Sequence, residues 1–403
     1  MWHSLNPAAI CLHKNLYRFM KGNIQILFTS ISLFLFSFFI FNWIYVVSDI
    51  AIHSGTSMAY INKQESLPSN FLYYWLISFS SFFQPELLRY SSTILLGLLV
   101  VSRYIIVYVF LRQWYNNVFS ITQYNLISLS LIFLSSIFLP QLLYHRAYLG
   151  SFTPNIWHNS TTIAVMPFAL LLFYITVNQI KKFSWHRLIM IIVLVNLNAS
   201  IKPSYLFVYA CALPLTLVIC KGLSRSFFLQ VIPSIAALLI IYILSVLIYQ
   251  GEDNSENIAI QLNPFFVYAS WHNNPSLLIT FLLFLASILT SWAFPLYVFL
   301  KKGVKKNDIY SVFSIIGVIG ALIISILFAE TGIRTFHGNF FWQVYISSFI
   351  FFLVAVKQSI FELTNNIGTI KIRYLNAYQI LFGLHLSFGI LYILKLLLFR
   401  SFF

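Results

Sequence analysis

Hydrophobic residues occur in long runs along this chain, and short polar segments separate the runs. Each run is close to the roughly 20 residues that a helix needs to cross a bilayer, and a helix satisfies its own backbone hydrogen bonds. The runs are too long for the strands of a membrane barrel. The pattern therefore predicts an all-α polytopic integral membrane protein with about eleven transmembrane helices. The expected spans are 24–47, 88–111, 120–143, 162–180, 188–201, 204–220, 228–249, 277–299, 309–329, 340–356 and 378–398.

Two segments depart from this regular pattern. The runs 188–201 and 204–220 are short and meet at Lys202-Pro203, where proline cannot continue a helix, so the chain is expected to turn there without fully crossing. Residues 71–83 are too few to span and rich in aromatic side chains. They predict a helix that lies in the membrane interface, where amphipathic rings are favoured.

Composition supports a membrane protein with a single domain over residues 1–403. Hydrophobic residues make up 60% of the chain, charged residues only 8%, and the mean hydropathy is +0.85, which excludes a soluble globule. No repeat and no soluble domain is visible. The first run follows a basic N-terminus and is longer than a signal-peptide core, so it is interpreted as a retained anchor. Outer loops are expected near 48–87, 144–161, 250–276 and 330–339.

Charge placement predicts the orientation. With the N-terminus in the cytoplasm, most of the 24 lysine and arginine residues fall on the cytoplasmic side, including the Lys-Lys-Gly-Val-Lys-Lys segment at 301–306. The C-terminus then faces outside. Most of the nine acidic residues fall on the outer side as well. Acidic residues follow no strong topology rule, so this asymmetry indicates chemistry on the outer face.

Three outer segments carry residues suited to chemistry. If the first helix continues for one turn, Asp49 and His53 share a face, and the pair is a candidate general base or a plain helix-end cap. Residues 155–162 place Trp157, His158 and Asn159 before a helix N-terminus that favours anions, although simple capping would also explain the serine and threonines. Arg146 and His158 could add positive charge to this second segment.

The third segment, 330–339, packs Glu330, Arg334, His337 and Asn339 between two spans, which exceeds what a connecting turn needs. An internal Glu330–Arg334 ion pair is the alternative explanation. In the preceding outer loop, the aromatic and amide side chains around Trp271 and His272 suit the binding of sugars. Lys202 at the helix break is a candidate for a functional cation, because basic residues within a membrane usually have a partner and a role.

Several function classes are excluded by missing motifs. The chain has no phosphate-binding glycine loop, no His-Glu-x-x-His helix and no Gly-x-Ser-x-Gly elbow. The three cysteines have no metal-like spacing, and neither a disulfide framework nor a zinc site is indicated. Any reaction must therefore use a substrate that is already activated and reachable within the membrane, such as a lipid-linked sugar.

The order of these segments resembles the GT-C superfamily of membrane glycosyltransferases. The similarity rests on Asp49 and His53 after the first helix, the Leu67–Tyr74 segment, 157–162, Lys202-Pro203-Ser204 and 330–339, and it extends to bacterial enzymes that decorate O-antigen with glucose. It implies transfer of a hexose from a polyprenyl-phosphate carrier to a surface glycan acceptor, on the periplasmic face of a bacterial inner membrane. Many members carry a paired acid where this chain has only Asp49, so a second acid would come from Glu65, Glu86 or Glu330.

The resemblance also implies roles for the candidate residues. The catalytic residues would be Asp49, His53 and Glu330, with Asp49 as the general base of an inverting transfer. The donor phosphate would be bound by Lys202, Arg146, Arg334, His337 and His158. The acceptor would be bound by Trp157, Asn159, Trp271, His272 and Asn339. No metal, other cofactor or nucleic acid is expected; the partners would be the lipid-linked sugar, membrane lipids, a companion flippase and a polyprenyl-phosphate sugar synthase.

Three rival functions fit the sequence less well. An O-antigen polymerase would join lipid-linked repeat units on the same face, but few basic residues and no large domain lie outside. A flippase for lipid-linked oligosaccharides would show charges deep within several spans and two repeated halves. A membrane acyltransferase would depend on cytoplasmic His186, which stands alone.

Overall fold

The computed structural model describes residues 7–68, 70–116, 118–137, 151–250, 259–273, 275–336, 338–364 and 375–400, with side chains from residue 23 onward except at 225, 248–250 and 333. Its helices are α1 (Pro7–Ile44), α2 (Asp49–Ile61), α3 (Leu72–Ser80), α4 (Leu88–Trp114), α5 (Ile121–Phe133), α7 (Ser160–Lys181), α8 (Trp185–Ile201), α9 (Ser204–Lys221), α10 (Arg225–Gln230), α11 (Ile232–Gln250), α12 (Phe266–Trp271), α13 (Leu277–Ser291), α14 (Ala293–Lys302), α15 (Ile309–Leu327), α16 (Trp342–Thr364) and α17 (Ala377–Phe399). Two short antiparallel strands, β1 (Ile260–Leu262) and β2 (Phe328–Glu330), pair with each other. Short 3-10 turns lie at Tyr45–Val47, Pro85–Leu87, Gly332–Arg334 and Asn339–Phe341.

The predicted all-α membrane protein is confirmed at the level of its helices. Within the described ranges, eight helices are long and apolar enough to cross a membrane, or nine if α13 and α14, bent by 73° at their junction, form one span. Each of the predicted spans overlaps at least one helix, although 228–249 and 277–299 are each divided between two helices, and residues 138–143 of the third span lie outside the described residues. However, α5 has 13 residues and α8 has 17, so these two are shorter than full spans. Eleven crossings therefore stay a prediction.

The predicted span 120–143 contains a shorter helix than expected. Helix α5 ends at Phe133, and Leu134 is already extended. The Ser135 N–H donates to the His385 carbonyl at 3.1 Å, and the Ile137 N–H donates to the Thr290 carbonyl at 3.3 Å. Neighbouring helices thus supply the hydrogen bonds that an unwound backbone cannot find in lipid.

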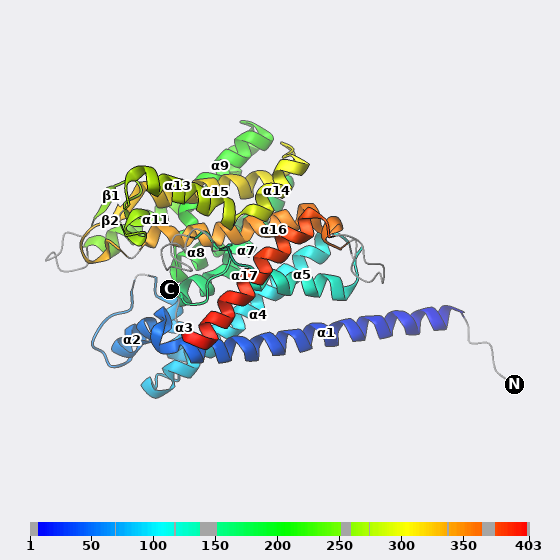
Figure 1. Ribbon diagram of the computed structural model, residues 1–403, viewed down its shortest axis with the longest axis horizontal. Coiled ribbons are helices and arrows are strands. Elements are labelled where there is room, and N and C mark those ends of the chain that lie inside the picture. Colours follow the sequence, from blue (N-terminus) through cyan, green and yellow to red (C-terminus); the bar gives the residue numbers. More distant parts are fainter. Residues whose placement is uncertain are drawn as a thin grey trace.

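Helices α7 and α16 form the centre of the bundle, and α1, α11 and α17 lie at its periphery. The apolar windows of α16 and α7 are 83% and 78% buried, whereas those of α1 and α11 are each 22% buried. Figure 1 shows α1 along one edge of the molecule and α7 and α16 within it. Hydrophobic side chains on the peripheral helices are exposed at the surface of the bundle, where they would contact lipid.

The helices share two ends. The N-termini of α7 and α16 and the break between α8 and α9 meet where Lys202 contacts Asn159 and Trp342, close to Asp49. We name this the Asp49 end; it also holds α2, α3 and the two strands (Figure 1). Helix α7 has 22 residues, so its last residue, Lys181, lies about 33 Å away along the helix. We name that the Lys181 end.

A glycine in α17 allows the end of α5 to approach closely. A Cβ added at Gly389 would lie 1.6 Å from the Phe133 carbonyl oxygen, whereas a Cβ at Gly383, in the same helix, would meet nothing within 4 Å. We expect Gly389→Ala to destabilise the protein by about 3 kcal/mol or more, because backbone must move. Gly383→Ala should be neutral. Thermal unfolding of both variants in detergent measures the difference, and equal melting temperatures would contradict this packing.

Candidate functional site

Asp49 and His53 lie one turn apart on a helix, as expected, but this helix is not the first one. Helix α1 ends at Ile44, a 3-10 turn covers Tyr45–Val47, and Ser48 is extended before α2 begins at Asp49. The chain changes direction at this break, and the carboxylate of Asp49 lies in the first turn of α2. The partial positive charge of a helix N-terminus favours a carboxylate at that position.

The amide of Asn159 joins Asp49 to Lys202. Its Nδ2 donates to Asp49 Oδ2 at 2.6 Å. Its Oδ1 accepts from Lys202 Nζ at 2.9 Å and from the Thr162 N–H at 2.9 Å, which caps α7. Only this orientation of the amide satisfies both sides, because a carboxylate can only accept and an ammonium can only donate. The acid and the base are thus held together without a direct ion pair between them.

Lys202 is buried at the break between α8 and α9. Pro203 follows it, its own backbone is extended, and its N–H donates to the Asn198 carbonyl at 2.8 Å. The ammonium group contacts Thr161 Oγ1 at 3.0 Å and lies 4.6 Å from the ring centre of Trp342. Burial lowers the pKa of Lys202 from the usual 10.5 to about 7, against the opposing effect of Asp49. A nearby anion would favour its charged form.

Both histidines of this cluster are neutral at pH 7. Burial lowers the pKa of His53 to about 4, helped by Lys202 and opposed by Asp49, and His53 Nδ1 lies 2.9 Å from Tyr74 Oη. Burial also lowers the pKa of His158 to about 4, and its ring packs edge-on against Trp342 at 6.0 Å. Burial thus disfavours the positive charge that was expected of His158, and its part in binding the donor phosphate stays a prediction.

Arg334 and Glu330 belong to the same end of the bundle. Arg334 ends the 3-10 turn after β2. Burial raises the pKa of Tyr74 to about 12, and the positive charge of Arg334 opposes this rise. Glu330 is paired with Ile260 across the two strands and accepts a hydrogen bond from Asn339 Nδ2 at 2.5 Å. A narrow gap beside it, too small to hold a water molecule, is lined by Thr335, Gly338, Asn339 and Phe341, among others.

The residues predicted to bind the acceptor are only partly exposed. Trp157 is 3% exposed and packs among Phe36, Phe41 and Phe133, which favours a structural role over the predicted sugar contact. His272 is fully buried, and its Nδ1 lies 2.9 Å from the Tyr268 carbonyl oxygen. Trp271 covers Gly338 and packs on Phe341 at 4.6 Å, next to the Glu330–Asn339 pair.

Some residues fall outside this description, and others were missed. Arg146 and His337 lie outside the described residues. Trp342, Tyr74 and Thr161 contact the cluster, although no catalytic or binding role was predicted for them. Thr161 lies within 155–162, Trp342 closely follows 330–339, and Tyr74 lies in the aromatic segment 71–83, so their position in the sequence was their only signal. Among the described residues, no group of three His, Cys, Asp or Glu side chains could hold a metal ion.

Comparisons with known proteins add no evidence to the geometry of this site. The chain matches no protein-family model, and a search of curated proteins finds no similar sequence.

Proposed function

We propose that this protein is a membrane glycosyltransferase that moves a hexose from a polyprenyl-phosphate carrier to a surface polysaccharide such as O-antigen. The observation that carries the proposal is the Asp49–Asn159–Lys202 arrangement. One buried amide holds a carboxylate and an ammonium side by side at one end of an apolar bundle. Transfer from a lipid phosphate needs these two groups, one to accept a proton and one to stabilise a phosphate.

The proposed reaction is a single displacement with inversion at the anomeric carbon. Asp49 accepts the proton of the acceptor hydroxyl while that oxygen forms a bond to the anomeric carbon. The bond from this carbon to the phosphate oxygen breaks, and the lipid phosphate leaves with the electron pair. Lys202 and Arg334 would stabilise the charge that grows on the phosphate. Neutral His53, hydrogen-bonded to Tyr74, would position the acceptor near Asp49.

The distribution of charge supports an active site on the periplasmic face. The Lys181 end carries Lys181, Lys182, Arg187, Lys221, Lys301, Lys302, Lys305, Lys306 and Lys357. Loops rich in lysine and arginine stay in the cytoplasm, which would turn the Asp49 end outward. In a bacterial inner membrane, that is where lipid-linked sugars meet surface glycans. The lipid tail would lie along the apolar helices.

The test compares the surface glycan of cells with the intact gene and with a deletion. Mass spectrometry reads the mass of each repeat unit, and gel electrophoresis reads the chain lengths. We expect the deletion to remove one hexose mass per repeat and to leave the chain lengths unchanged. Repeats of full mass in short chains would instead indicate a polymerase, and full loss of surface glycan would indicate a flippase; either result contradicts the proposal.

The lowered pKa of Lys202 predicts the pH dependence. A lysine with a pKa of about 7 loses its charge as pH rises through 7, so phosphate binding should weaken above that pH. We expect kcat/KM for the lipid-linked donor to fall about tenfold per pH unit above neutrality. Lys202→Arg keeps its charge at these pH values, so kcat/KM of this variant should stay nearly constant above neutral pH. If kcat/KM of Lys202→Arg falls with pH as in the wild type, another group causes the fall.

A further inference from the structure

The Lys181 end of the bundle contains a second group of polar residues, far from Asp49. It lies where the last turn of α7, the first turn of α15 and the end of α4 meet α16. Lys181 closes α7, Tyr310 lies in the first turn of α15, Trp114 closes α4, and Lys357 lies on α16. We name these four residues the Tyr310 cluster.

Two lysines approach one aromatic ring in this cluster. The Nζ of Lys181 lies 4.1 Å from the ring centre of Tyr310, and the Nζ of Lys357 lies 5.1 Å from the same centre. Lys357 also lies 5.9 Å from the ring centre of Trp114. The ring is fixed, since Tyr310 is 2% exposed and its hydroxyl donates to Asn178 Oδ1 at 3.2 Å. Rigid aromatic residues therefore hold two cations close to each other.

One carboxylate faces these two charges. Lys181 and Lys357 repel each other, and Asp308 attracts both while its Oδ2 accepts hydrogen bonds from Ser311 at 2.6 Å and from Gln358, so a single negative charge is set against two cations. In the part of the chain that the structure describes, the one ion pair within 4 Å is Lys302–Glu362.

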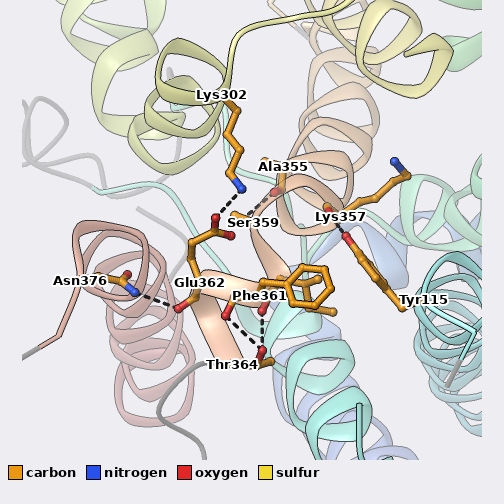
Figure 2. A network of polar contacts seen from close by, with 10 residues as sticks. Tyr115, Lys302, Ala355, Lys357, Ser359, Phe361, Glu362, Thr364 and Asn376 are labelled. Carbon is orange, nitrogen blue, oxygen red and sulfur yellow. Dashed lines mark hydrogen bonds and ion pairs between the residues drawn. The ribbon is translucent and has the colours of Figure 1, made fainter. Parts of the chain in front are cut away.

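Figure 2 shows this ion pair away from the side chain of Lys357. Lys302 reaches Glu362, whereas the side chain of Lys357 points away from both. The hydroxyl of Tyr115 donates to the Lys357 backbone carbonyl, which ties α4 to α16 beside the cluster (Figure 2). Of the remaining acids, those at positions 49, 65, 86 and 330 belong to segments of the Asp49 end, and those at 252, 253 and 256 lie outside the described residues. An excess of positive charge thus remains between α7 and α16.

We propose that the Tyr310 cluster binds the phosphate of an anionic membrane lipid in the leaflet at the Lys181 end. A phosphate accepts hydrogen bonds from both ammonium groups and removes their mutual repulsion. Lys181 is the last residue of one candidate membrane span and Lys357 lies in the last third of another, which would place the cluster near the lipid headgroups. The acyl chains would then extend along the apolar faces of the bundle. Basic pockets between transmembrane helices are known to bind such headgroups. This site is independent of sugar transfer at Asp49.

The test measures lipid binding to the purified full-length chain by native mass spectrometry in detergent. The probes are dioleoyl phosphatidylglycerol, dioleoyl phosphatidylcholine and soluble glycerol 3-phosphate. The variants are Lys181→Gln with Lys357→Gln, the same pair changed to arginine, and Lys182→Gln, which removes a charge from an exposed neighbour. Each lysine near a headgroup is worth about a fivefold gain in affinity, so the glutamine pair should lose about 25-fold for phosphatidylglycerol.

We expect the arginine pair to keep its affinity and Lys182→Gln to change it by less than about twofold. Retained binding in the arginine pair separates loss of charge from loss of folding. Three results would overturn the proposal: equal affinity for both lipids, equal losses in Lys182→Gln and the glutamine pair, or binding of soluble glycerol 3-phosphate as tightly as the lipid. The last result would assign the site to a free phosphate compound instead.

Discussion

Asp49→Asn should slow sugar transfer by about 10³-fold while leaving the fold intact. The asparagine side chain keeps the shape of aspartate, and its carbonyl oxygen can still accept the hydrogen bond from Asn159 Nδ2 that Asp49 Oδ2 accepts in the structure. It cannot accept a proton at neutral pH. General-base catalysis contributes about 10²- to 10⁴-fold to the rate, so we expect kcat to fall by about 10³-fold with little change in the KM for the donor.

The measurement uses purified protein in nanodiscs with a polyprenyl-phosphate hexose and an isolated repeat-unit acceptor. Glu362→Gln is the matched control, since it removes a carboxylate that pairs with Lys302 at the Lys181 end, far from Asp49. The control should keep its rate within about twofold. Full activity in Asp49→Asn would exclude Asp49 as the base and leave Glu330, which is 5% exposed and hydrogen-bonded to Asn339, as the candidate.

Asn159→Asp should have the second largest effect, because it changes both partners of the amide. A carboxylate in place of the Nδ2 group would lie close to Asp49 Oδ2, where two like charges cannot both persist, so one of the two acids takes a proton. The same carboxylate would pair with Lys202 and neutralise the cation that is proposed to bind phosphate. We expect a loss of about 10²- to 10³-fold in kcat/KM, with contributions from both the base and the donor site.

The cap of α7 makes this substitution interpretable. The aspartate retains an oxygen that can accept from the Thr162 N–H, and aspartate caps helices as well as asparagine does. The helix should therefore remain folded. Asn62→Asp, at the exposed C-terminal end of α2, gives the same change of charge away from the cluster; it should leave activity unchanged and destabilise the helix by less than about 1 kcal/mol. Unfolding curves of both variants check this, and wild-type activity in Asn159→Asp would remove the amide from the mechanism.

The hydrophobic pattern by itself determined the class of fold. Long apolar runs can only be satisfied as helices in lipid, so the all-α membrane architecture follows from the sequence. The pattern could not determine where a helix unwinds inside the bundle. Helix α5 stops at Phe133 because carbonyls of His385 and Thr290 accept the freed N–H groups, and these partners lie far away in the sequence. A break of this kind depends on neighbours that only the folded chain provides.

The sequence also determined which segments carry polar chemistry, but the tertiary structure decided which of their residues meet. Asp49, Asn159 and Lys202 stand out as isolated polar residues at the ends of apolar runs, and the hydrogen bonds of one amide bring them together. A linear pattern cannot report burial. In the folded chain Trp157 is buried in the core, and burial lowers the pKa values of His53 and His158 so that both are neutral. The fold also places Trp342 over Lys202. The end of an apolar run in the sequence identifies a polar residue as a candidate for function. The charge and the partners of that residue depend on which other helix ends lie near it in the folded chain.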